Sequence, residues 1–78
     1  MVNELEVHLH GGLDEFANRD KVNIIQVASD VTVQDVCRKV GLSKKEVYLV
    51  SIDGKQAKFE REISDGKKLD IYPVFGGG

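Results

Sequence analysis

The chain has 78 residues, of which 41% are hydrophobic and 31% charged, and its formal net charge is −2. This length allows one domain with one small hydrophobic core. The charges are mixed rather than clustered as Lys and Arg, which argues against nucleic acid and favours a protein partner. No apolar run approaches the ~20 residues that span a bilayer, and no secretion signal begins the chain, so we expect a cytoplasmic protein without membrane contact.

Two segments near the start of the chain predict a β-hairpin. Hydrophobic residues alternate with polar ones over residues 5–9, which is the period-two pattern of a strand with one buried face. Residues 22–27 predict a second strand, in which Ile25 and Val27 face the core. The two strands are expected to pair with each other.

The connection between these strands, residues 10–20, is long and mixes turn-forming residues with two hydrophobic ones. The hydrophobic residues are Leu13 and Phe16. We expect both side chains to fold back onto the core.

Residues 33–40 predict the main helix. Hydrophobic side chains at i, i+3, i+4 and i+7 line one stripe of it: Val33, Val36, Cys37 and Val40. Thr32 is the best N-cap, and Asp35 completes a weaker form of the capping box. Gly41 ends the helix because it adopts the left-handed conformation that side chains resist. Residues 43–46 predict one further capped turn.

The rest of the chain predicts three more strands. Residues 47–52 are the most strand-like run, and the pair Asp53-Gly54 closes it in a tight turn. Residues 57–63 predict a short edge strand and a turn, and residues 69–74 predict the last strand. Regular pairing should fail near Pro73, which has no backbone N–H to donate.

This order of elements places one main helix across one face of a mixed four- to five-stranded sheet. It is the order of an α+β protein of the β-grasp, or ubiquitin-like, fold. We expect residues 1–74 to form this domain and residues 75–78 to form a flexible glycine tail outside it.

No residue inside the domain requires a catalytic role. Neither Gly54-Lys55 nor Gly66-Lys67 has a glycine five residues before it, so neither forms a phosphate-binding loop. His8 and His10 share one strand face, but zinc needs three or four ligands, so a solvated face is expected instead. Cys37 is predicted to be a core residue rather than a nucleophile, and as the single cysteine it forms no internal disulfide. We expect no bound cofactor and no metal.

The chain ends in three glycines, Gly76 to Gly78. A backbone without Cβ atoms can thread a narrow channel, and the carboxylate of a terminal glycine is unhindered. The extended chain from Pro73 to Gly78 reaches about 20 Å, enough to enter a partner's active site while the domain stays outside. The alternative is a frayed end without a role.

The whole chain resembles the ThiS/MoaD family of sulfur-carrier proteins, within the ubiquitin-like superfamily. The segments that carry this resemblance are Gly11-Gly12-Leu13-x-x-Phe16-Ala17, Val31-Thr32-Val33-x-Asp35-Val36, Ile52-Asp53-Gly54-Lys55, Ser64-Asp65-Gly66-Lys67-Lys68-Leu69 and Pro73-Val74-Phe75-Gly76-Gly77-Gly78. The first of them looks most like the small subunit of molybdopterin synthase.

The resemblance implies that an ATP-using adenylyltransferase of the ubiquitin-activating type activates the carboxylate of Gly78, which a sulfur donor converts to a thiocarboxylate. Gly76 and Gly77 would occupy that partner's channel. Phe75, bulkier than is common before the terminal glycines, would contact the partner and distinguish it from others. ATP would be used by the partner.

The chain would then be a co-substrate rather than an enzyme, a monomer when isolated. It would deliver sulfur to the large subunit of a synthase in molybdopterin biosynthesis. Three alternatives stay open: a sulfur carrier of the thiamin pathway, a modifier joined to target lysines through Gly78, and an interaction module with an idle tail.

Overall fold

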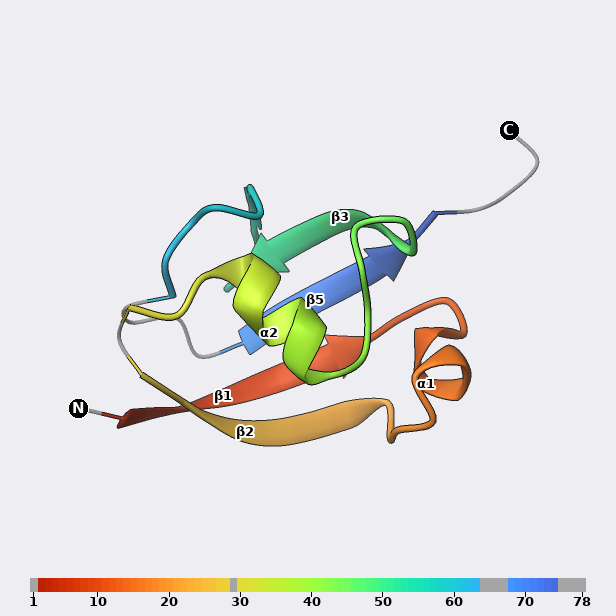
Figure 1. Ribbon diagram of the computed structural model, residues 1–78, viewed down its shortest axis with the longest axis horizontal. Helices are drawn as coiled ribbons and strands as arrows, with labels where there is room; N and C mark the ends of the chain where they lie inside the picture. Colours follow the sequence, from red (N-terminus) through yellow and green to blue (C-terminus); the bar gives the residue numbers. More distant parts are fainter. Residues whose placement is uncertain (1, 29, 64–67, 75–78) are drawn as a thin grey trace.

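The computed structural model describes residues 2–28, 30–63 and 68–74, and its centre is a five-stranded mixed sheet crossed on one face by one main helix (Figure 1). The elements in chain order are β1 (Val2–Leu9), α1 (Leu13–Phe16), β2 (Val22–Ala28), α2 (Val33–Lys39), β3 (Val47–Ile52), β4 (Lys55–Ala57) and β5 (Lys68–Pro73). The strand order is β2-β1-β5-β3-β4. The predicted α+β, β-grasp fold is confirmed.

The sheet is mixed because its two central strands run in parallel. β1 pairs with β5 in parallel, whereas β1 with β2, β3 with β5, and β3 with β4 are all antiparallel pairs. The predicted opening hairpin is therefore present. A parallel pair requires a long crossover, and α2 lies in that crossover against the sheet (Figure 1).

The core lies between α2 and the sheet. It consists of Leu5, Val7, Leu9, Leu13, Val27, Val33, Val36, Cys37, Val40, Leu42, Val47, Val50, Ile52, Ile63, Leu69 and Ile71. The predicted hydrophobic stripe of the helix is completely buried. Two residues of β2 were predicted to face the core. Val27 is buried there, and Ile25 is half-buried and packs against the core. The core-facing residues of β1, β2 and α2 were thus predicted correctly from their periodicity.

The start of α2 is capped as predicted. The Asp35 backbone N–H donates to Thr32 Oγ1 at 3.2 Å, and the Thr32 backbone N–H donates to Asp35 Oδ2 at 3.0 Å. This reciprocal pair is a capping box, even though Asp replaces the more usual Glu. At the other end Gly41 has φ of +89°, the left-handed conformation expected of it.

One core prediction is wrong. Leu13 is buried, but Phe16 is 64% exposed. Residues 13–16 form the one-turn helix α1, and on a helix the residue that shares a face with Leu13 most closely is four positions on, which is Ala17. Ala17 is the residue that packs against the core, so Phe16 points outward.

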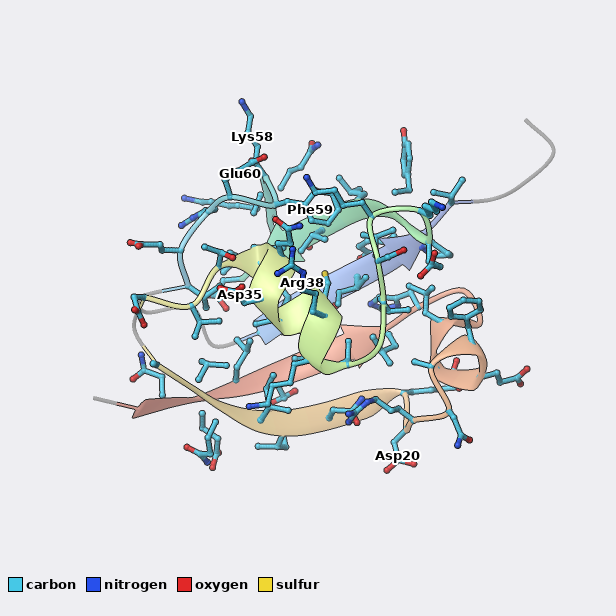
Figure 2. The ribbon with its side chains drawn as sticks, viewed as in Figure 1. Asp20, Asp35, Arg38, Lys58, Phe59 and Glu60 are labelled. Carbon is cyan, nitrogen blue, oxygen red and sulfur yellow. The ribbon has the colours of Figure 1, made fainter. Side chains whose placement is uncertain are left out.

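The later strands differ from prediction at their boundaries, and β5 is Lys68–Pro73 where residues 69–74 were predicted. The edge strand β4 is Lys55–Ala57, two residues earlier than the predicted segment, because the tight turn at Asp53-Gly54 leads directly into pairing with β3. The turn after β4 brings Phe59 beside α2, where its carbonyl accepts from the Gln34 N–H (Figure 2). Within the described residues, no helix is both long and apolar enough to cross a membrane.

Candidate functional site at the root of the tail

The four residues predicted to form the site, Phe75, Gly76, Gly77 and Gly78, lie outside the described residues. The last described residue is Val74, directly after β5. The structure therefore describes the place where the predicted tail is attached, which we call the tail root: residues 73 and 74 and the side chains that surround them.

The tail root is held on a central strand. β5 pairs with β1 on one side and with β3 on the other. Pro73 is buried opposite Val47, and the backbone N–H of Val74 donates to the carbonyl of Glu46 at 3.1 Å. The ladder to β1 covers residues 68–71, and beyond it the pairing with β3 and the hydrogen bond to Glu46 hold the chain in position up to Val74.

The loop that holds Val74 is itself braced, which confirms the predicted turn at residues 43–46. Glu46 accepts from the Ser43 backbone N–H at 2.9 Å and from the Ser43 hydroxyl at 2.8 Å. The backbone hydrogen bond, and then the hydroxyl one, hold the pKa of the Glu46 carboxyl below its ordinary value, because both stabilise the charged form.

Exposed hydrophobic side chains surround the tail root. Phe16 is 64% exposed, Tyr48 73% and Val74 49%. Tyr48 lies at a β-bulge, since the pairing of β3 with β5 shifts register between Val47 and Leu49. The extra residue turns its side chain out of the regular alternation, as bulges commonly do. The shift also confirms that pairing is irregular near Pro73.

A groove adjoins the tail root. Its volume is about 390 Å³, and its lining residues are Gly11, Gly12, Leu13, Phe16, Lys45, Glu46, Pro73 and Val74. They come from three segments: the β1–α1 connection with α1, the loop before β3, and the end of β5. Figure 1 shows these segments meeting at one end of the sheet.

A larger hollow of about 490 Å³ lies on the other side of α1. Its lining is polar: Asp14, Glu15, Asn18, Arg19, Asp20 and Asn23. None of these residues belongs to β5 or to the loop before β3, so this hollow does not share the tail root. Among the described residues no group of three His, Cys, Asp or Glu side chains is arranged to hold a metal.

The sheet face opposite α2 carries a second cluster. His10 Nε2 lies 2.9 Å from Asp70 Oδ1, and the His10 ring stacks on Tyr72 with 4.5 Å between centroids. His8 shares this face, as its position predicted, and its Nε2 lies 2.8 Å from Glu6 Oε1. The sheet face that was expected to be fully solvated is therefore partly covered by its own side chains, and Asp70 on it is only 7% exposed.

Cys37 lies where the sequence predicted it, in the core at 2% exposure. Burial raises the pKa of its thiol to about 11, because a thiolate would lose its solvation there. Such a group is not an activated nucleophile.

The exposure of Tyr48 was not predicted from the sequence. Val47 and Val50 are both buried although they are three residues apart, and a regular strand would place them on opposite faces. The register shift between Val47 and Leu49 accounts for this difference and leaves Tyr48 exposed. The strand alternation placed His8 and His10 on one face, but no local pattern indicated that His10 would contact Asp70 and Tyr72.

The fold and its capped helix define a ubiquitin-like β-grasp protein. The family model described as Mut7-C ubiquitin matches residues 2–77, and the chain belongs to this family. No curated protein sequence matches the chain.

Several solved structures share the fold. SAMP1 from Haloferax volcanii aligns with a TM-score of 0.69 at 21% identity, covering 97% of this chain and 100% of its own. The protein HVO 2177 from the same organism aligns with a TM-score of 0.73 at 22% identity, covering 99% of this chain and 88% of its own. A candidate molybdopterin converting factor, subunit 1, from Pyrococcus furiosus aligns with a TM-score of 0.70 at 15% identity, covering 90% of this chain and 95% of its own. At these identities the similarity shows the fold alone.

Proposed function

We propose that this protein is a sulfur carrier whose Gly78 carboxylate is adenylated by a partner enzyme and converted to a thiocarboxylate. The observation that supports this proposal most is the tail root. A central strand, fixed to its neighbours up to Val74, leads directly into Phe75 and three glycines, and exposed hydrophobic side chains surround its end. This arrangement suits a rigid domain that presents a thin, reactive end to another protein.

The chemistry requires activation because a carboxylate is a poor acyl donor, since its oxygen is a poor leaving group. In the proposed first step, a carboxylate oxygen of Gly78 attacks the α-phosphate of ATP held by the partner, forming an acyl-adenylate and releasing pyrophosphate. A donor at the oxidation level of sulfide then attacks the acyl carbon, and AMP leaves with the bond electrons. The product is a thiocarboxylate, which is ionised and nucleophilic at sulfur.

In this proposal the domain is a co-substrate, and its own side chains supply recognition. Gly76 and Gly77 occupy the channel of the adenylyltransferase. Phe16, Tyr48 and Val74 form the apolar surface next to that channel, since partly exposed aromatic side chains are the usual anchors of protein interfaces.

We further propose molybdopterin, the organic part of the molybdenum or tungsten cofactor, as the product that receives the sulfur. Two observations support it. The loop Gly11-Gly12-Leu13 resembles the small subunit of molybdopterin synthase, and in the structure this loop forms one wall of the groove at the tail root. The fold is also shared with the Pyrococcus furiosus protein named as a converting factor subunit. A thiamin-pathway carrier is the alternative within the same chemistry.

A second candidate function is a protein modifier, in which the activated Gly78 is transferred to a target lysine as an isopeptide. It is favoured by the shared fold with a structure titled small archaeal modifier protein 1 from Haloferax volcanii, which aligns with a TM-score of 0.68 at 20% identity, covering 90% of this chain and 95% of its own. The two functions use the same acyl-adenylate and differ in the nucleophile that takes the acyl group.

Intact-mass measurement tests the proposal. The chain is co-expressed with an adenylyltransferase of the ubiquitin-activating type and a sulfur donor, and its mass is compared with that of a variant lacking Gly77 and Gly78. Replacement of one oxygen by sulfur in the full chain alone supports the carrier. Larger, lysine-linked adducts support the modifier. Full biological activity of the truncated variant would contradict both.

A further inference from the structure

The strand β2 forms a long outer edge of the sheet (Figure 1). The strand at the other edge, β4, has three residues, whereas β2 has seven and contains no proline. On the sheet face opposite α2, Val22 is 45% exposed and Ile24 is 56% exposed. Proteins usually shorten such an edge or protect it with charged residues, because an open edge can pair with another strand.

The outward backbone groups of β2 belong to its even-numbered residues. The Leu9 N–H donates to the Lys21 carbonyl at 2.8 Å, so the odd-numbered residues of β2 form the hydrogen-bonded pairs with β1. The Gln26 carbonyl agrees with this alternation, because it accepts from Lys39 Nζ at 3.4 Å and not from β1. The backbone groups at even-numbered positions therefore point to the free edge.

Two residues of this edge have unused backbone groups. Within the described residues, the N–H and C=O groups of Val22 and Ile24 make no hydrogen bond on the outer side. These are also the two residues with exposed hydrophobic side chains. The Lys39 ammonium group covers only the carbonyl of Gln26, so the edge is protected at one end and open over the rest.

We propose that β2 pairs antiparallel with β2 of a second copy of the chain, with Val22 opposite Ile24 across a two-fold axis. In this register the outward N–H and C=O groups of the two residues exchange hydrogen bonds, and the axis repeats the exchange. Both side chains lie on the same sheet face, so Val22 of each copy packs against Ile24 of the other. The two sheets become one continuous sheet.

The charges near the two ends of this pairing are complementary. Asp20 of one copy lies opposite Gln26 of the other, beside the Lys39 ammonium that binds the Gln26 carbonyl. Asp20 and Lys39 are both exposed, and Figure 2 shows Asp20 directed away from the fold. A shift of two residues in either direction would place Asp20 opposite the hydrophobic Ile24 or Ala28 instead. The edge is thus complementary to itself, which favours a second copy over a strand of another protein.

The pairing is weak and reversible. A contact along one strand edge belongs to the small interfaces, below about 1,200 Å², that support transient association. The chain is then a monomer at low concentration and a dimer at high local concentration. Since β1 separates β2 from β5, the dimer leaves the tail root free, and the proposal stands whether or not Gly78 is activated.

Sedimentation equilibrium of the full chain over a wide concentration range, under reducing conditions and without partner or ATP, tests the pairing. We expect the apparent mass to rise reversibly from that of one chain toward that of two. Ile24→Lys should weaken the association at least ~tenfold, because a lysine on an edge strand opposes pairing. The matched control is Tyr48→Lys, which replaces a 73% exposed hydrophobic residue of β3 and should leave the association unchanged.

A charge exchange tests the register. Asp20→Lys should weaken the association, because it places a second ammonium group beside Lys39. The double variant Asp20→Lys with Lys39→Asp reverses both charges and should restore the association. In NMR spectra of the unmodified chain, the amide shifts that change with concentration should centre on Val22 and Ile24.

Three results would overturn the proposal: the mass of a single chain at every concentration, association that survives Ile24→Lys, or a double variant that associates no better than Asp20→Lys. Association that is lost in Tyr48→Lys would also overturn it, by placing the dimer contact near the tail root. Dispersed amide signals establish that each variant is folded. The intact-mass test of Gly78 does not depend on these results, so the two proposals fail separately.

Discussion

His10 and Tyr72 lie ring on ring, with 4.5 Å between their centroids and 8° between their planes. The same imidazole hydrogen-bonds Asp70 across the parallel pair β1–β5, 60 residues away in the chain. Since a carboxylate can only accept, the His10 Nε2–H is the donor. One side chain thus joins the two central strands on the face that α2 does not cover.

The first prediction concerns this side chain. His10→Ala should lower the free energy of unfolding by about 1–3 kcal/mol, because it removes the hydrogen bond to the nearly buried Asp70 and the stacking on Tyr72. Urea denaturation followed by circular dichroism measures the loss. The matched control is His8→Ala, whose partner Glu6 is exposed, with an expected change within ~0.5 kcal/mol. Equal losses in the two variants would show that the Asp70 contact does not matter.

The second prediction concerns the N-cap of α2. Thr32→Ala should cost about 1 kcal/mol of stability, because the Asp35 backbone N–H loses the side-chain oxygen that accepts from it. Thr32→Ser keeps a hydroxyl at this position and should retain most of the stability. The same denaturation experiment measures both variants, and an undisturbed midpoint in Thr32→Ala would contradict the cap.

The third prediction is a pH dependence. Hydrogen bonds from the Thr32 backbone and hydroxyl lower the pKa of Asp35 below its ordinary value, and those from the Ser43 backbone and hydroxyl do the same for the pKa of Glu46. A carboxyl with a depressed folded-state pKa stabilises the fold above its unfolded-state value and loses that contribution as the pH falls through the folded one. Stability should therefore decline from about pH 5 downward. Carboxyl-carbon NMR titration checks the two pKa values. In the double variant Asp35→Asn with Glu46→Gln, the free energy of unfolding should fall less steeply with decreasing pH. An unchanged slope in that variant would contradict the prediction.

The fourth prediction concerns Cys37. Its thiol is buried and its pKa is raised to about 11, so almost no thiolate forms at neutral pH and none is accessible. Iodoacetamide labelling at pH 8, followed by mass spectrometry, should be slow in the folded protein and fast in urea. Rapid labelling without denaturant would mean that α2 opens locally, and would revive Cys37 as a reactive residue.

The fifth prediction links the exposed tail root to the proposed function. Tyr48→Ser should slow formation of the Gly78 thiocarboxylate about tenfold by weakening partner binding, a loss typical of one aromatic anchor. The matched control is Ile24→Ser, which removes a hydrophobic side chain of 56% exposure from β2, the sheet edge farthest from β3 and β4. Initial rates from intact-mass measurements give the comparison, and equal rates in the two variants would exclude Tyr48 from the interface.

The main elements followed from the sequence because their causes are local. The stripe from Val33 to Val40 and the alternation over residues 5–9 record which face of a helix or strand is buried, and the Thr32–Asp35 cap spans three residues. These patterns can be recognised in the sequence without knowing which distant parts of the chain are in contact. Phe16 was the exception, because a one-turn helix offers too little periodicity to show which face is buried.

The candidate site followed only in part. The glycines at 76 to 78 suggested a reactive end, with a frayed end as the alternative, and this stays a prediction because they lie outside the described residues. The groove at the tail root could not be predicted, since it is built from three segments, around Leu13, Lys45 and Pro73, that are distant in sequence.

The sequence by itself determined the β-grasp order of elements and the buried faces of β1, β2 and α2. Only the tertiary structure decided that Val74 is tied to Glu46, that Phe16 opens onto a groove, and that His10 covers Asp70. The reason is the parallel pairing of β1 with β5: it joins the two ends of the chain, and its register is chosen by packing of the whole core rather than by any local pattern.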